Sequence, residues 1–126
     1  METFHYLAQC PYPFVWQELA ANPNTPADVL QDLCSKRDSE WNDSRLLRLL
    51  AEHPNADRAV LLKVLAQLEA RLLTATSRPY AAVLALAARP ELTPKELQPL
   101  ATLPGASPRM RTGLSRRLAN RAPKNP

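Results

Sequence analysis

Glycine and cysteine are scarce in this chain of 126 residues, which contains only two of each. With so few glycines the chain cannot form the glycine-rich loop that binds phosphate in many proteins, and it has no P-loop, GxGxxG or GxSxG motif. The cysteines, Cys10 and Cys34, are far apart and form no CxxC pair. We therefore expect no disulfide framework and predict a reduced, cytoplasmic protein.

Long apolar runs are also missing. No stretch approaches the roughly 18 apolar residues that span a bilayer, and the N-terminus, Met-Glu-Thr-Phe-His, lacks the regions of a signal peptide. His5 and His53 form no HxxxH or HExxH pattern, so a metal site is not expected. Neither cysteine has an adjacent base. We therefore predict a protein that is not an enzyme, needs no cofactor, binds no small-molecule substrate and does not associate with membranes.

Proline, in contrast, is abundant, with 13 residues. It recurs in the pattern Leu-Ala-x-x-Pro, which occurs at 7–11, 19–23, 50–54, 86–90 and 100–104, with a looser copy at 118–123. Because proline cannot continue a helix, each copy marks the end of one helix. The leucines at 19, 50, 86 and 118 define a larger unit of about 31 to 36 residues, which suits a pair of helices.

Helix-start signals follow these prolines. Thr25 is the predicted N-cap of one helix, and Thr93 begins a complete capping box, TPKE. Asn55 is the predicted N-cap in the middle of the chain, and Ser107 in the last unit. His53, at the end of its helix, is expected to bond the last carbonyl groups of that helix.

Apolar residues recur at helical spacing, and no alternating run of strand type appears. The predicted helices are 2–9, 13–21, 26–36, 44–52, 57–74, 79–88, 94–102 and 108–119. Pro99 is expected to kink or shorten the seventh. The segments 35–44 and 73–79 are predicted breaks between units.

The repeated string resembles the leucine-rich repeat variant family, whose repeats contain Leu-Ala-x-Asn-Pro-x-Thr-Pro-x-x-Val-Leu. The segment 15–33, VWQELAANPNTPADVLQDL, fits closely, whereas 46–65 and 82–100 fit in part. The resemblance implies an all-α fold, a short right-handed α-solenoid of about three and a half two-helix repeats with short 3₁₀ helices. A compact bundle like that of HEAT repeats also suits the uneven units. Some relatives hold an iron–sulfur cluster on four N-terminal cysteines, but only Cys10 lies in that region here.

We predict one domain over 1–120, with units at about 7–23, 24–54, 55–90 and 91–120, and a basic tail at 121–126. All twelve acidic residues lie at or before Glu96, so the C-terminal end is strongly basic. Its cations are Arg109, Arg111, Arg116, Arg117, Arg121 and Lys124. Such a patch can bind phosphates or an acidic protein, or it can simply be the polar outside of a terminal capping helix, which is the interpretation we favour.

Aromatic residues supply the remaining candidates. Trp41 stands in the polar break SEWND, where it can anchor a partner or fold back over the seam between units, the second being favoured. Trp16 is expected to pack in the core or against the N-terminal cap of the fold. The stretch YPFVW around it would indicate a partner or self-association if exposed. Cys10 and Cys34 are predicted to be small buried residues. The function predicted is a non-catalytic scaffold that binds another protein, and the alternative is nucleic-acid binding through the basic C-terminal helix.

Overall fold

A computed structural model describes residues 2–74 and 79–120, with side chains from residue 4 onward. Within these residues the chain forms helices and no strand, so the all-α prediction is confirmed. The elements are α1 (Glu2–Ala8), α2 (Pro13–Ala21), α3 (Ala27–Leu33), α4 (Glu40–Glu52), α5 (Arg58–Thr74), α6 (Tyr80–Ala87), α7 (Pro94–Leu97), the 3₁₀ helix η1 (Gln98–Thr102) and α8 (Pro108–Asn120).

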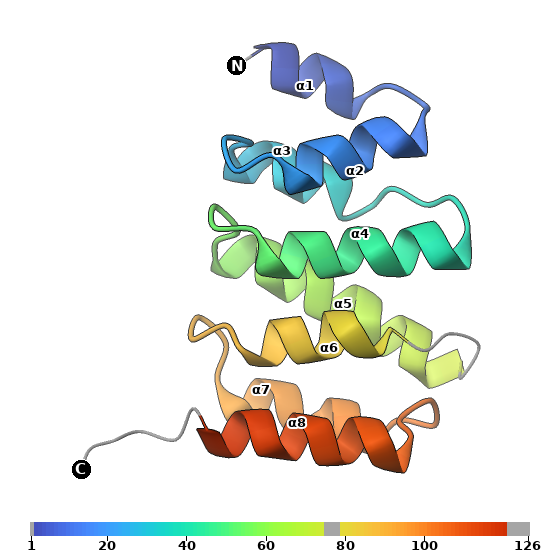
Figure 1. The fold of residues 1–126 in the computed structure, drawn as a ribbon, viewed down its shortest axis with the longest axis vertical. Coiled ribbons are helices and arrows are strands. Elements are labelled where there is room, and N and C mark those ends of the chain that lie inside the picture. The colour runs from blue at the N-terminus through green and yellow to red at the C-terminus, as the bar shows by residue number, and fades with distance from the viewer. Residues whose placement is uncertain (1, 75–78, 121–126) are drawn as a thin grey trace.

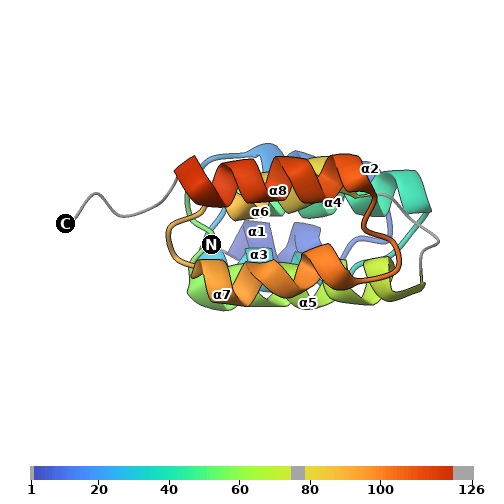
Figure 2. The same cartoon turned by 90° about the horizontal axis from the view of Figure 1, so that it is seen from below.

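The helices lie in two layers (Figures 1 and 2). One layer contains α2, α4, α6 and α8, stacked in this order along the long axis, and the other contains α3, α5 and α7 with η1. Helix α1 lies at the N-terminal end of the stack, against α2 and α3. Turns between the layers therefore gather along two opposite edges of the molecule.

The core lies between the two layers. Its largest fully buried side chains are Leu30, Leu33, Leu47, Leu50, Leu61, Leu68, Leu72, Leu86, Leu92, Leu97, Leu100 and Met110. Leu19, Leu50 and Leu86 of the repeated motif occupy the last turns of α2, α4 and α6 and are buried, whereas Leu118 of α8 is partly buried. Each fully buried leucine contributes about 2 kcal/mol, which explains why this position keeps its leucine.

Three helix boundaries follow the local signals. The Thr93 hydroxyl accepts the Glu96 N–H at 3.2 Å and the Glu96 carboxylate accepts the Thr93 N–H at 2.8 Å, so the capping box is confirmed. Ser107 Oγ accepts the Met110 N–H at 3.1 Å and caps α8. Helix α7 ends at Leu97 and η1 follows, so the shortening expected at Pro99 is confirmed.

The predicted N-caps Thr25 and Asn55 are both wrong. Thr25 is buried, and its hydroxyl donates to Leu19 O at 2.7 Å, closing the end of α2 instead of opening α3. The Asn55 amide donates to Pro23 O at 3.0 Å and Thr25 O at 2.9 Å in the preceding turn. Asp57 supplies the cap of α5, since its Oδ1 accepts the Val60 N–H at 3.0 Å. Short polar side chains bond whichever backbone group is nearest. For Thr25 this is the last turn of α2, and for Asn55 it is the stacked turn before it.

His53 also departs from prediction. Its Nε2 bonds Asn22 O at 2.7 Å in the preceding turn, and its Nδ1 accepts the Asn55 N–H at 2.9 Å. Because Nδ1 accepts, these two bonds assign the proton to Nε2. The side chain is buried, so His53 joins two successive turns instead of bonding its own helix.

Arg89 holds the equivalent position in the next turn. Its guanidinium donates to Ala51 O at 3.2 Å, to His53 O at 2.7 Å and to Ala56 O at 2.8 Å. It also pairs with Glu91 at 3.1 Å, and only 14% of its side chain is exposed. We call the edge formed by the stacked turns 22–26, 53–57 and 89–93 the turn edge (Figure 1).

The opposite edge, which we call the linker edge, comprises the connections 9–12, 34–39 and 103–107 (Figure 1). Here the Trp16 indole N–H donates to Cys10 O at 2.7 Å, and the Gly105 N–H donates to Leu72 O at 2.7 Å. Asp43 of α4 pairs with Arg71 of α5 at 2.8 Å. The connections on this edge are therefore held in place by side chains and backbone carbonyl groups of the adjacent helices.

Candidate binding surfaces

Helix α8 presents an unpaired cationic surface. Met110 and Leu114 are buried and define its inward side. Arg109, Arg116 and Arg117 are exposed, and helical geometry places them within a sector of about 100°. Within residues 2–74 and 79–120 none of these three guanidinium groups makes an ion pair or a hydrogen bond. We call them the arginine face.

The other basic candidates do not join this face. Arg111 points away from it around the helix, and its guanidinium donates to Ala106 O at 2.7 Å, fixing the loop before α8. Arg121 and Lys124 lie outside the described residues. The structure therefore brings together three of the six cations that the sequence singled out.

Trp41 does not lie in an irregular segment and does not cover a seam, so both expectations are wrong. Helix α4 begins one residue before it, capped by Ser39, whose Oγ accepts the Asn42 N–H at 3.1 Å. The inward positions of α4 include Asp43 and Leu47, which leaves Trp41 on the opposite side with 77% of its surface exposed. The sequence contains the N-cap signal of this helix, Ser39 followed by an acidic first turn. The polarity of the segment nevertheless favoured an irregular break over a helix.

The aromatic residues near the N-terminus divide between core and surface. Trp16 is buried, as predicted. Tyr6, Tyr12 and Phe14 are exposed at 73%, 57% and 68%, and the Tyr12 and Phe14 rings lie 5.9 Å apart between centroids. Together with Trp41 they place four exposed aromatic rings on α1, α2, α4 and the turn between α1 and α2.

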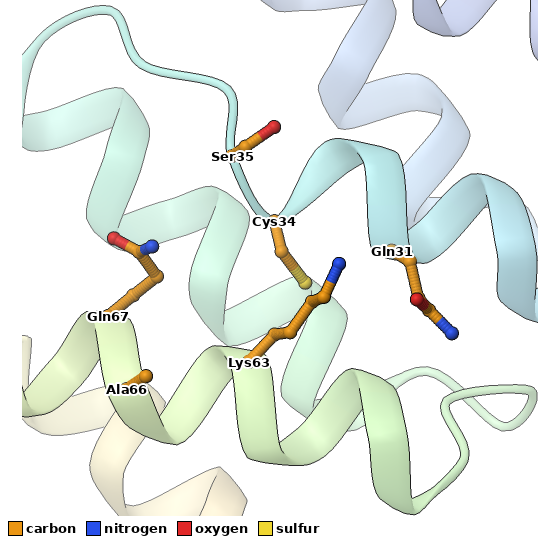
Figure 3. Close-up of a pocket in the computed structure, with 6 residues that line it drawn as sticks. All are labelled: Gln31, Cys34, Ser35, Lys63, Ala66 and Gln67. Carbon is orange, nitrogen blue, oxygen red and sulfur yellow. The ribbon is translucent and has the colours of Figure 1, made fainter.

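A small hollow separates the end of α3 from α5 (Figure 3). It has a volume of about 220 Å³ and is lined by Gln31, Cys34, Ser35, Lys63, Ala66 and Gln67. Small-molecule sites are larger, about 300 to 1,000 Å³. Burial raises the pKa of the Cys34 thiol to about 11, so this group stays protonated at neutral pH. The hollow offers no activated nucleophile.

Both cysteines were expected to be buried, and they differ. Cys34 is buried, and its thiol points at Val60 O at 3.9 Å. Cys10, in the turn after α1, is only partly buried. His5 pairs with Asp28 at 2.8 Å, and this hydrogen bond lowers the pKa of the carboxyl. In the part of the chain that the structure describes, no group of three or more potential metal ligands is found.

One exposed ion pair joins α5 to the cap of α7. The Arg58 guanidinium bonds both carboxylate oxygens of Glu96 and also Glu91 O at 2.8 Å. The hydrogen bond from Arg58 and the backbone N–H of Thr93 lower the pKa of Glu96 to about 2. This carboxylate therefore serves the capping box and the contact between helices together.

Comparison with known protein families, curated proteins and solved structures finds no match to this chain. None of the helices in the described ranges is long and apolar enough to cross a membrane.

Proposed function

We propose that this protein is a short right-handed α-solenoid that acts as a non-catalytic scaffold for another protein. The repeated Leu-Ala-x-x-Pro joints and the two stacked layers support the solenoid, as do the bonds between successive turns through His53, Asn55 and Arg89. Stacked helix pairs bury a continuous core and leave extended surfaces for a partner.

The exposed aromatic residues are the observation that supports binding of a protein partner. Aromatic side chains are enriched in protein interfaces, where they often carry much of the binding energy. Phe14 and Trp41 lie on the outward sides of α2 and α4, opposite the buried positions of each helix. Their rings expose large apolar areas to water, which is unfavourable in free energy. A partner that covers the rings would remove this unfavourable exposure. The partner expected is a folded protein with an apolar patch.

Photo-crosslinking tests this proposal. A benzoylphenylalanine at position 14 or 41 should give a crosslinked species of defined mass in the cells that produce the protein. The control carries the same group at position 95, where Lys95 is exposed on α7 in the other layer. Equal products from all three positions, or none from 14 and 41, would contradict the proposal.

The crosslinked partner, once identified, allows a direct measurement. Trp41→Ser should weaken its binding about 30-fold, the effect of losing an aromatic hot spot worth about 2 kcal/mol. Lys95→Ser should leave the affinity unchanged. A crosslinked mass equal to two copies of this chain would identify self-association instead, and sedimentation at increasing concentration would then show dimers of the wild-type protein.

A further inference from the structure

The outward side of α6 carries only short, uncharged side chains. Ala81 and Ala88, the exposed positions, carry only methyl groups, whereas Leu84 and Ala85 are partly buried. The segment 80–88 contains no charged residue. Because α6 lies between α4 and α8 in its layer, long side chains on these neighbours dominate the charge of this surface (Figure 1).

The arginine face borders this uncharged helix. Gly113 packs against α6, since a Cβ at this position would lie 3.2 Å from Leu84 Cδ2. Arg117 is one turn further along α8 on the same side, which places it beside α6. Arg109 and Arg116 are two turns apart, about 10.5 Å along the axis, and lie further outward. A surface running from α6 across α8 thus carries three guanidinium groups.

Acidic groups do not neutralise this surface. Helix α8 contains no acidic residue, and none follows Glu96 in the sequence. On the other flank of α6, the Arg48 guanidinium lies 3.9 Å from Glu52 on the same helix, so that pair contributes little net charge. The positive potential is therefore concentrated over α8.

We infer that the arginine face binds the phosphate backbone of a double-stranded nucleic acid. Arginine donates two parallel hydrogen bonds to a phosphate, and three unpaired guanidinium groups within one sector suit neighbouring phosphates. This inference goes beyond the proposed function and does not depend on it, because it uses α8 and not the exposed aromatic residues.

Two absences distinguish the duplex from other polyanions. An acidic protein partner would need apolar anchors at the centre of its interface, and the exposed positions beside the arginines on α6 are alanines. A single strand would need aromatic platforms for its bases, and α6 and α8 expose none apart from Tyr80, which is half-buried. A duplex backbone requires only charge and hydrogen-bond donors.

Fluorescence anisotropy with a short labelled DNA duplex tests the inference. Three phosphate contacts predict that log K falls against log salt with a slope of about −2.7, and the Arg109→Gln/Arg116→Gln variant should retain a slope of about −0.9. The matched control is Lys63→Gln/Lys95→Gln, which removes the same charge from the opposite layer and should bind like the wild type. Circular dichroism checks that both variants are folded.

Other outcomes overturn the inference. Equal weakening in both double variants would show that only net charge matters. A slope near zero would exclude phosphate contacts. Displacement of the duplex by polyglutamate as effectively as by unlabelled duplex would assign the face to an acidic protein, and tighter binding of a single strand would exclude the duplex. Crosslinks at positions 14 and 41 are unaffected by any of these results, so the two proposals fail separately.

Discussion

The turn edge and the linker edge join the same helices by different means. On the turn edge, long polar side chains from one turn bond the carbonyl groups of the turn before it, as His53, Asn55 and Arg89 do. On the linker edge, the Trp16 side chain also bonds a carbonyl group, but the last linker is joined to α5 by the backbone itself, the Gly105 N–H bonding Leu72 O at 2.7 Å. The turn edge therefore joins successive units through side chains, whereas the linker edge also joins them through a close approach of the backbone.

This difference predicts how each edge tolerates substitution. A turn whose carbonyl groups are bonded by a neighbour's side chain loses its partners when that side chain is shortened. A linker packed against a backbone carbonyl is sensitive to any added atom. Four predictions test this contrast, beginning with the largest effect.

Arg89→Ala should have the largest effect. It removes the donor for one carbonyl group at the end of α4 and two in the turn after it, at a cost of about 3 kcal/mol in the free energy of unfolding. Urea denaturation followed by circular dichroism measures this loss. Arg109→Ala is the control, because its exposed side chain should change stability by less than about 0.5 kcal/mol. Similar losses for both variants would refute the role of Arg89.

The two glycines should respond differently to alanine. A Cβ at Gly105 would lie 2.8 Å from the backbone Leu72 O, so Gly105→Ala should lose about 2 kcal/mol of stability. At Gly113 the nearest atom is Cδ2 of Leu84, which can move. Gly113→Ala also gains helix propensity and should be neutral or stabilising by up to about 1 kcal/mol. Thermal unfolding of both variants measures the difference, and equal effects would contradict the close approach at Gly105.

Asn55→Ala tests the turn edge at a single amide. The side chain bonds two carbonyl groups of the preceding turn, so its loss should cost about 1.5 kcal/mol of unfolding free energy. Asn24→Ala makes the same change in the preceding turn at an exposed residue and should be close to neutral. Chemical denaturation of both variants measures the two costs, and no difference between them would argue against the bridging role of Asn55.

The smallest effect concerns pH. The folded-state pKa of Glu96 is lowered from 4.5 to about 2, so its contribution to stability is present above pH 4.5 and is lost as pH falls towards 2. Glu96→Gln should remove this part of the pH dependence while lowering stability slightly at neutral pH, since the pair is exposed. Thermal unfolding temperatures of both proteins between these pH values check the prediction. Parallel profiles would refute it.

Part of the candidate surface could be predicted from the sequence. The angular grouping of Arg109, Arg116 and Arg117 follows from helix geometry alone, and their exposure follows from the buried stripe of α8. The exposure of Trp41 could not be deduced, because it depends on where Ser39 begins α4 and on which side of the helix packs inward. That the arginine face borders α6 could not be deduced either, because it depends on the order of the helices in their layer.

The sequence by itself determined the all-helical fold class and most helix boundaries. Prolines, the Thr93 capping box and Ser107 act within one turn of the chain, so their effect can be deduced from local chemistry. Tertiary structure alone decided the partners of His53 and Asn55. A polar side chain can bond any carbonyl group within reach, and only the stacking of turns about 30 residues apart brings the chosen ones close.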